Sequence, residues 1–99
     1  MRGEKLFKTA RCDSCHKGEL FTDLQKHDVG TGKDDEAKKR FDTPTLIEAW
    51  RTAPYLLDGR ALTILDVLSK KYNPKDRHGK TSNLTEKQLT DLAEYVLSL

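Results

Sequence analysis

Two cysteines and a histidine stand close together near the amino end of this chain of 99 residues, in the segment Cys12-Asp13-Ser14-Cys15-His16. Two thiols one helical turn apart can each form a thioether with one vinyl group of a haem, and the imidazole that follows is then held against the iron. The spacing therefore predicts one covalent haem c attached through Cys12 and Cys15, with His16 as the proximal iron ligand.

Other uses of a paired-cysteine motif fit this chain less well. A structural zinc site needs four ligands at compact spacings, whereas the chain has no further cysteine, and His27 and His78 stand far apart. A thioredoxin-like pair would follow a strand of a βαβ unit, and no alternating or β-branched run precedes Cys12. A plain disulfide would leave His16 without a role. The pattern favours a c-type cytochrome, and a free or disulfide-bonded pair stays open as the alternative.

Length and composition favour one small domain built around a large ligand. Only 35% of the residues are apolar, so a buried haem would supply volume that the side chains do not. The net charge is only +2, and the haem propionates would oppose it, so nucleic-acid binding and a polybasic membrane contact are not expected. No apolar run approaches the roughly 20 residues of a membrane span. We expect a single mono-haem domain over residues 1–99.

The first five residues, Met1-Arg2-Gly3-Glu4-Lys5, contain no apolar segment of the kind found in secretory signals. Haem is normally attached to such motifs outside the cytoplasm. A periplasmic or extracellular bacterial location is therefore expected, with the chain as a mature form or an excised domain. Redox protein partners or a larger parent protein are expected, and the sequence does not indicate an oligomeric state.

Helices separated by irregular segments are the predicted organisation. In the first helix Leu6, Phe7 and Ala10 share a face, and the helix leads directly into the attachment motif. Glycines and a dense run of charges predict a long loop over residues 17–40. A second helix is predicted from Thr43-Pro44-Thr45 to Pro54.

Two capping boxes predict the later helices. Thr63 with Asp66 begins a helix that extends to about residue 71, and Thr85 with Gln88 begins the last helix. The last helix has an apolar stripe suited to a core, made of Leu89, Leu92, Ala93 and Val96.

Small and aromatic residues stand on the first and last helices at matching spacings. Gly3 and Phe7 are four apart, and Leu92 and Tyr95 are three apart. The chain in this respect resembles class I cytochromes c, whose first and last helices cross at a small-residue contact backed by an aromatic. The resemblance implies an all-α cytochrome c fold with crossing N- and C-terminal helices around one covalently bound haem.

Short motifs along almost the whole chain carry a closer resemblance. They are Cys12-Asp13-Ser14-Cys15-His16-Lys17-Gly18, Phe21-Thr22-Asp23, His27-Asp28-Val29-Gly30, Phe41-Asp42-Thr43-Pro44-Thr45-Leu46, Thr52-Ala53-Pro54-Tyr55, Asp58-Gly59-Arg60 and Leu84-Thr85-Glu86. Together they resemble the C-terminal haem domain of the bacterial di-haem cytochrome c peroxidase and MauG family, in a single-haem form.

The chain departs from that family at three places. Members commonly carry Arg where Ile47 stands and His where Leu57 stands, so polar contacts there are not expected. The family's methionine ligand would follow the helix at 63–71, and the only methionine of this chain is Met1. Methionine ligation is therefore not expected.

The sixth iron position has several candidate ligands: His78, His27, Tyr72 and the lysines. His78 is favoured, because it stands beside Gly79 in the loop 73–83, where the family usually delivers its distal ligand, and imidazole is a strong iron donor. A solvated loop histidine is the alternative. His27 is expected near a propionate or capping its own loop, with ligation as its alternative. Two imidazoles would give a low-spin haem of low potential.

Further candidates would hold the rest of the haem. Arg51 and Arg60 are candidates to pair with the propionates through their planar donor forks, and the Trp50 indole N–H or the Tyr55 hydroxyl to bond there too. Each is also explicable as surface charge or as a core aromatic. The pocket walls are expected to include Leu46, Leu65 and Leu68.

One-electron transfer is the favoured function, since it needs only a haem of suitable potential and access. Two alternatives stay open. The first is a haem peroxidase, which needs an open iron position and a distal acid or base, for which Glu48 and His27 are candidates. The second is a redox relay domain excised from a larger secreted enzyme.

Overall fold

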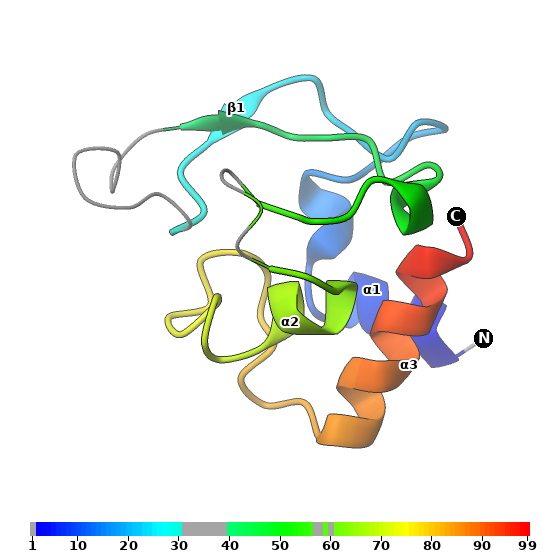
Figure 1. Cartoon of the computed structure of the whole chain (residues 1–99), viewed down its shortest axis with the longest axis vertical. Helices are drawn as coiled ribbons and strands as arrows, with labels where there is room; N and C mark the ends of the chain where they lie inside the picture. Colours follow the sequence, from blue (N-terminus) through cyan, green and yellow to red (C-terminus); the bar gives the residue numbers. More distant parts are fainter. Residues whose placement is uncertain (1, 31–39, 57–58, 60) are drawn as a thin grey trace.

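The computed structural model describes residues 2–30, 40–56, 59 and 61–99. Its helical elements and strands, in chain order, are α1 (Arg2–Thr9), the 3-10 turn η1 (Cys12–Ser14), β1 (Lys26–His27), β2 (Phe41–Asp42), the 3-10 turn η3 (Ala49–Arg51), α2 (Ile64–Leu68) and α3 (Glu86–Leu97). Figure 1 shows α1 and α3 crossing at one side of the molecule, with α2 beside them and the strands at the far end. No helix within this described part is long and apolar enough to cross a membrane.

The crossing of α1 and α3 depends on one glycine and two aromatic rings. A Cβ atom at Gly3 would lie only 2.6 Å from the Cβ of Tyr95, so only a residue without a side chain lets the two helices approach this closely. Phe7 packs edge-on against Tyr95 with ring centroids 5.4 Å apart, and Leu92 is fully buried beneath them. The predicted crossing of the first and last helices is confirmed.

Both predicted capping boxes are present. The side chain of Thr85 accepts from the Gln88 N–H at 3.1 Å, and the Gln88 side chain accepts from the Thr85 N–H at 2.9 Å. Thr63 and Asp66 make the same pair of bonds at the start of α2. α2 ends at Leu68, short of the predicted residue 71, because the backbone turns extended at Ser69.

The prediction of a helix from residue 43 to Pro54 is wrong except for the single turn η3. The backbone of this stretch is held by distant partners instead. The Thr43 carbonyl accepts from the Thr22 hydroxyl at 2.5 Å, and the Thr43 N–H donates to the Gln25 carbonyl at 2.9 Å. The Thr45 hydroxyl also donates to the Leu20 carbonyl. These long-range bonds compete with the local bonds that a helix would require.

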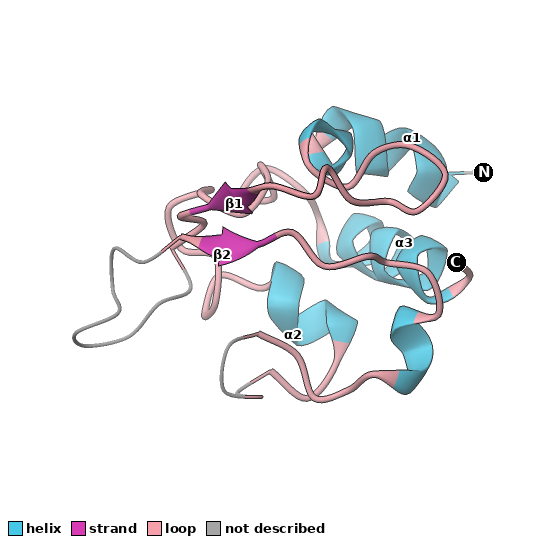
Figure 2. Cartoon of the chain, turned by 90° about the horizontal axis from the view of Figure 1, so that it is seen from above, coloured by secondary structure: helices cyan, strands magenta, loops and turns pink. Residues whose placement is uncertain are grey.

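A small antiparallel sheet adds to the helices. β1 and β2 pair Lys26 with Asp42 and His27 with Phe41 (Figure 2). The pairing falls partly within the stretch 17–40 that was predicted as loop, and residues 31–39 lie outside the described part. The arrangement is therefore mostly helical with one two-stranded sheet. The apolar core is small and consists of Phe7, Ala10, Ala49, Ile64, Leu92, Ala93 and Val96.

Candidate haem site

A cavity of about 520 Å³ opens between the attachment segment, residues 41–56, α2 and the loop 73–83. Cofactor pockets in proteins usually measure roughly 300–1,000 Å³ and are mostly apolar. Leu46 and Leu68 line the cavity as predicted, whereas Leu65 is 42% exposed and lies outside the lining. Other apolar side chains of the wall include Phe7, Val29, Phe41, Leu56, Ile64, Val67 and Val96.

Both cysteines of the attachment segment face this cavity, and neither forms a disulfide. α1 delivers them, and the His16 N–H donates to the Cys12 carbonyl at 2.9 Å, which closes the turn that places the histidine after the second thiol. Burial raises the pKa of the Cys12 thiol to about 12. A buried thiol of raised pKa carries little thiolate at neutral pH, and this disfavours a reactive, thioredoxin-like cysteine at position 12.

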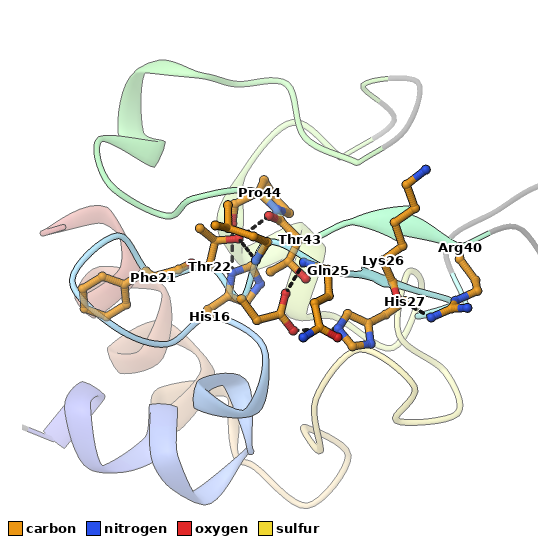
Figure 3. Close-up of polar contacts among 11 residues, drawn as sticks. His16, Phe21, Thr22, Gln25, Lys26, His27, Arg40, Thr43 and Pro44 are labelled. Carbon is orange, nitrogen blue, oxygen red and sulfur yellow. Dashed lines mark hydrogen bonds and ion pairs between the residues drawn. The ribbon is translucent and has the colours of Figure 1, made fainter.

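The His16 ring is held by two backbone carbonyls. Its Nδ1 lies 3.1 Å from the Phe21 carbonyl oxygen and 3.1 Å from the Pro44 carbonyl oxygen (Figure 3). Carbonyl oxygens only accept, so Nδ1 carries the proton and Nε2 keeps its lone pair. Burial also lowers the pKa of His16 and keeps the ring neutral. His16 therefore presents a neutral imidazole nitrogen in a fixed orientation, as a metal ligand requires.

His78 lines the same cavity from the loop 73–83. Burial, and secondly the charge of a protonated His16, lower the pKa of His78 to about 4, so its ring is neutral near pH 7. Its Nδ1 is buried and has no hydrogen-bond partner within the described ranges. No hydrogen bond within the described ranges therefore fixes the ring through Nδ1.

The two imidazoles face each other at a distance suited to one iron atom. Their ring centroids are 6.4 Å apart and their planes are inclined by 45°. A histidine nitrogen binds a transition metal at about 2 Å, and two rings on opposite sides of one metal ion therefore have centroids roughly 6.3 Å apart. The residues present fit a haem held between His16 and His78, with thioethers at Cys12 and Cys15.

His27 also reaches the cavity, from β1. Its Nε2 donates to the Asp23 carboxylate at 2.7 Å. Burial on its own raises the pKa of Asp23, but the bonds from His27 and from the Gln25 N–H outweigh it and hold that pKa well below its usual value. His27 is therefore oriented by a carboxylate and is not aimed through Nε2 at an iron atom.

The remaining predicted haem contacts are placed differently from one another. Tyr55 lines the cavity, and its hydroxyl donates to the Ala49 carbonyl at 2.7 Å. Trp50 is 58% exposed and is not part of the lining. Arg51 pairs with the Glu48 carboxylate at 2.6 Å in a surface hollow, so neither residue of that pair reaches the cavity. Arg60 and Leu57 lie outside the described residues.

Two residues of the site carry no clear sequence signal. Arg77 lines the cavity and pairs with the Asp28 carboxylate at 2.6 Å, although the charged run around it reads as a solvated loop. Asn73 is 3% exposed and bonds to the backbone of His78, although Asn73-Pro74 reads only as a helix terminator. A buried role for an asparagine depends on the path of the loop that surrounds it.

Comparisons with known proteins identify the family of this chain. The family described as Cytochrome c matches residues 1–99. A curated relative, hydrazine synthase subunit gamma of Kuenenia stuttgartiensis, is 33% identical over an alignment that covers 99% of this chain and 40% of the relative. A solved structure of Kuenenia stuttgartiensis hydrazine synthase, pressurised with xenon, superposes with a TM-score of 0.87 at 32% identity, over 99% of this chain and 45% of that one.

This chain therefore spans less than half the length of the proteins to which it is similar. The match extends over every element that surrounds the cavity. The predicted cytochrome c fold and the single haem c at Cys12 and Cys15 are confirmed, and the chain belongs to the cytochrome c family.

Proposed function

We propose that this domain transfers single electrons through one haem c whose iron is held between His16 and His78. The observation that carries the proposal is the opposition of two neutral imidazole rings, 6.4 Å apart, across an apolar cavity bordered by both attachment cysteines. Iron with six ligands has no open position for a substrate, and electron transfer does not require one.

The protein's own groups set the properties of such a centre. Bound haem supplies an iron that alternates between the ferric and ferrous states. The Phe21 and Pro44 carbonyls fix the tautomer of His16 and raise its basicity as a donor. The apolar walls limit the access of water and of small oxidants to the cavity. Ligation by two histidines in place of histidine and methionine gives a low reduction potential.

Spectra of the haem-loaded protein and of three variants test the ligation. The wild type is expected to be low-spin in both oxidation states. His78→Ala should become high-spin, whereas the matched variant His27→Ala should stay low-spin because His27 is bonded to Asp23. His78→Met should remain low-spin and raise the potential by on the order of 0.1–0.2 V, part of the range of about 0.8 V that axial ligands span. A His78→Ala protein with the wild-type spectrum would contradict the proposal.

A peroxidase is the second candidate, and the Asp23–His27 pair beside the cavity is the observation in its favour. A carboxylate-oriented imidazole can move a proton to or from peroxide. Glu48, the other candidate acid, pairs with Arg51 at the surface and does not line the cavity. Rapid oxidation of an added donor by peroxide, lost in His27→Ala, would support the peroxidase. Slow bleaching of the haem without turnover supports the electron carrier.

The relative suggests that the domain works as part of a larger protein. Its name makes it a subunit of hydrazine synthase, and this chain matches 40% of its length. The domain is proposed to relay electrons within a larger redox protein, or to a redox partner, in a periplasmic or extracellular compartment where haem c is attached. The resemblance to the di-haem peroxidase and MauG family stays a proposal, and the single attachment motif of this chain provides the one haem that a relay needs.

A further inference from the structure

Asn73 is the most buried polar side chain of the described residues, with 3% of its surface exposed. It stands at the start of the loop that carries His78, five residues before that histidine. A buried carboxamide is stable only where its donors and acceptor are bonded. The positions of its partners therefore indicate its role.

The Asn73 side chain bonds to both backbone groups of His78. Its Oδ1 accepts from the His78 N–H at 2.9 Å, and its Nδ2 donates to the His78 carbonyl at 3.0 Å. Nδ2 also lies 2.9 Å from the Gly79 carbonyl and 3.0 Å from the Thr81 hydroxyl. Two hydrogens serve three acceptors, so one of these bonds is shared. One side chain thus fixes the backbone on both sides of the histidine.

The ring of His78 has no comparable support of its own. Its Nδ1 is buried without a hydrogen-bond partner within the described ranges. Histidines that bind metals usually donate their second N–H to a carbonyl or carboxylate, and that bond fixes the ring. For His78 the backbone position must do this work, and Asn73 holds that backbone.

The same loop is tied to the attachment segment. The Lys80 N–H donates to the Ala10 carbonyl at 2.8 Å. Gly79 has a φ of 81°, and a Cβ atom there would lie 3.2 Å from the Ala10 carbonyl oxygen and 3.8 Å from the Cys12 Sγ. The loop therefore passes beside the Cys12 sulfur, and Asn73 fixes His78 within a segment that is bonded to the Ala10 carbonyl, two residues before that sulfur.

We propose that Asn73 is the positioning residue of the distal ligand: its carboxamide holds the backbone of His78 so that the imidazole reaches the iron and stays there. This inference rests on the proposed ligation by His78. Without the carboxamide, the His78 N–H and carbonyl lose their partners, and the histidine leaves the iron more often. The sixth position then opens to small ligands from solution.

Haem-loaded Asn73→Ala tests the proposal, with cyanide as the probe of the open position. We expect a partly high-spin ferric spectrum and cyanide binding about ten-fold faster or more than in the wild type, as for the loss of other groups that orient a metal ligand. Free imidazole should restore the low-spin spectrum, because it replaces the displaced ring. Asn73→Asp keeps the acceptor for the His78 N–H and loses the donors. Its high-spin fraction and its cyanide rate should lie between those of the wild type and those of Asn73→Ala.

Asp76→Ala is the matched control within the same loop. The Asp76 carboxylate accepts from the Thr81 and Ser82 N–H groups at 3.1 and 3.0 Å and does not bond to His78. Its loss should lower the unfolding midpoint and leave the spectrum and the cyanide rate as in the wild type. If Asn73 had only a structural role, its variants would behave in the same way: the unfolding midpoint would fall, and the spectrum and the cyanide rate would not change.

Each result decides between two outcomes. Wild-type spectra and cyanide rates in Asn73→Ala and Asn73→Asp would overturn the positioning role, as would an equal change in Asp76→Ala. If Asn73→Ala does not load haem, Asn73→Asp decides. A His78→Ala protein with the wild-type spectrum would overturn the ligation itself. High-spin His78→Ala beside unchanged Asn73 variants would overturn only the present inference.

Discussion

The two histidines that face each other across the cavity are held in opposite ways. His16 is held through its ring, because Nδ1 bonds to the Phe21 and Pro44 carbonyls at 3.1 Å each. His78 is held through its backbone, because Asn73 bonds to its N–H and its carbonyl, while its own Nδ1 has no partner in the described part of the chain. His16 also follows a cysteine that is bonded covalently to the cofactor.

In the proposed ligation, this difference makes His16 a permanent ligand and His78 one that can exchange. The ring of His16 keeps its tautomer and orientation in both oxidation states, because two fixed carbonyls define them. The orientation of the His78 ring depends on how firmly the loop 73–83 holds its backbone. We expect perturbations to release His78 first, and the following predictions test that order from the largest effect to the smallest.

Removing each histidine in turn gives the largest contrast. His16→Ala should yield little protein with covalently attached haem, because the attachment motif then lacks its imidazole. His78→Ala should keep the covalent haem and lose only the sixth ligand. Intact mass measures attachment, and the ferric absorption spectrum measures the spin state. The comparison fails if His78→Ala lacks haem, or if His16→Ala carries haem with a low-spin spectrum.

The helix crossing at Gly3 and Tyr95 allows a test that leaves both histidines in place. A Cβ atom at Gly3 would lie 2.6 Å from the Tyr95 Cβ, so Gly3→Ala should cost about 1–3 kcal/mol in the free energy of unfolding. The spectrum should remain low-spin at temperatures below the unfolding transition, because neither histidine is touched. Denaturant unfolding of the haem-loaded protein measures the change.

Lys8→Ala, at an exposed position of α1, is the control for Gly3→Ala and should change the stability little. A Gly3→Ala protein as stable as the wild type would mean that the helices separate without cost. A high-spin spectrum in that variant would mean that the crossing itself positions one of the two ligands.

Local signals predicted much of the fold. The capping boxes at Thr63 and Thr85 lie within four residues of sequence and act on the backbone beside them, so the starts of α2 and α3 were accessible without the structure. The spacings of Gly3 with Phe7 and of Leu92 with Tyr95 also indicated the helix crossing, and the motif at Cys12 indicated the cofactor.

Long-range bonds limited the rest of the prediction. The helix expected after Thr43 does not form, because the Thr43 and Pro44 carbonyls accept bonds from Thr22 and His16, more than twenty positions earlier. The role of Asn73 depends in the same way on a loop that returns to it. Neither arrangement leaves a periodic or capping signal in the sequence.

The hydroxyl of Thr22, close to His16, tests how firmly the His16 ring is held; it also accepts from the Leu24 N–H at 3.2 Å. The Thr22 hydroxyl donates to the Thr43 carbonyl at 2.5 Å, next to the Pro44 carbonyl that bonds His16. Thr22→Val should cost about 1 kcal/mol in the free energy of unfolding. The spectrum and the cyanide rate should not change, because both carbonyls that hold the ring remain.

Thr90→Val is the control for Thr22→Val, because the Thr90 hydroxyl donates to the Glu86 carbonyl at 3.0 Å on the exposed face of α3. Its effect on stability should be close to zero. Cyanide binding in Thr22→Val as fast as in Asn73→Ala would remove the distinction between a ring-held and a backbone-held ligand.

The pH dependence of stability that Asp91 causes is the smallest expected effect. It serves as a reference, because Asp91 contacts neither histidine. The hydrogen bond from Lys87 at 2.7 Å, together with Arg2 at 3.8 Å, lowers the pKa of Asp91 below its ordinary value of 3.8. A carboxyl whose pKa is lower in the folded state stabilises the fold above about pH 4, and this contribution is lost as the pH falls below that value. Asp91→Asn should therefore melt slightly below the wild type at pH 6, and the two should converge by pH 3. Thermal melts at both pH values, read separately by helix content and by haem absorption, measure the difference. If the variant changes the order in which the two signals are lost, the helix crossing and the His78 loop do not respond independently.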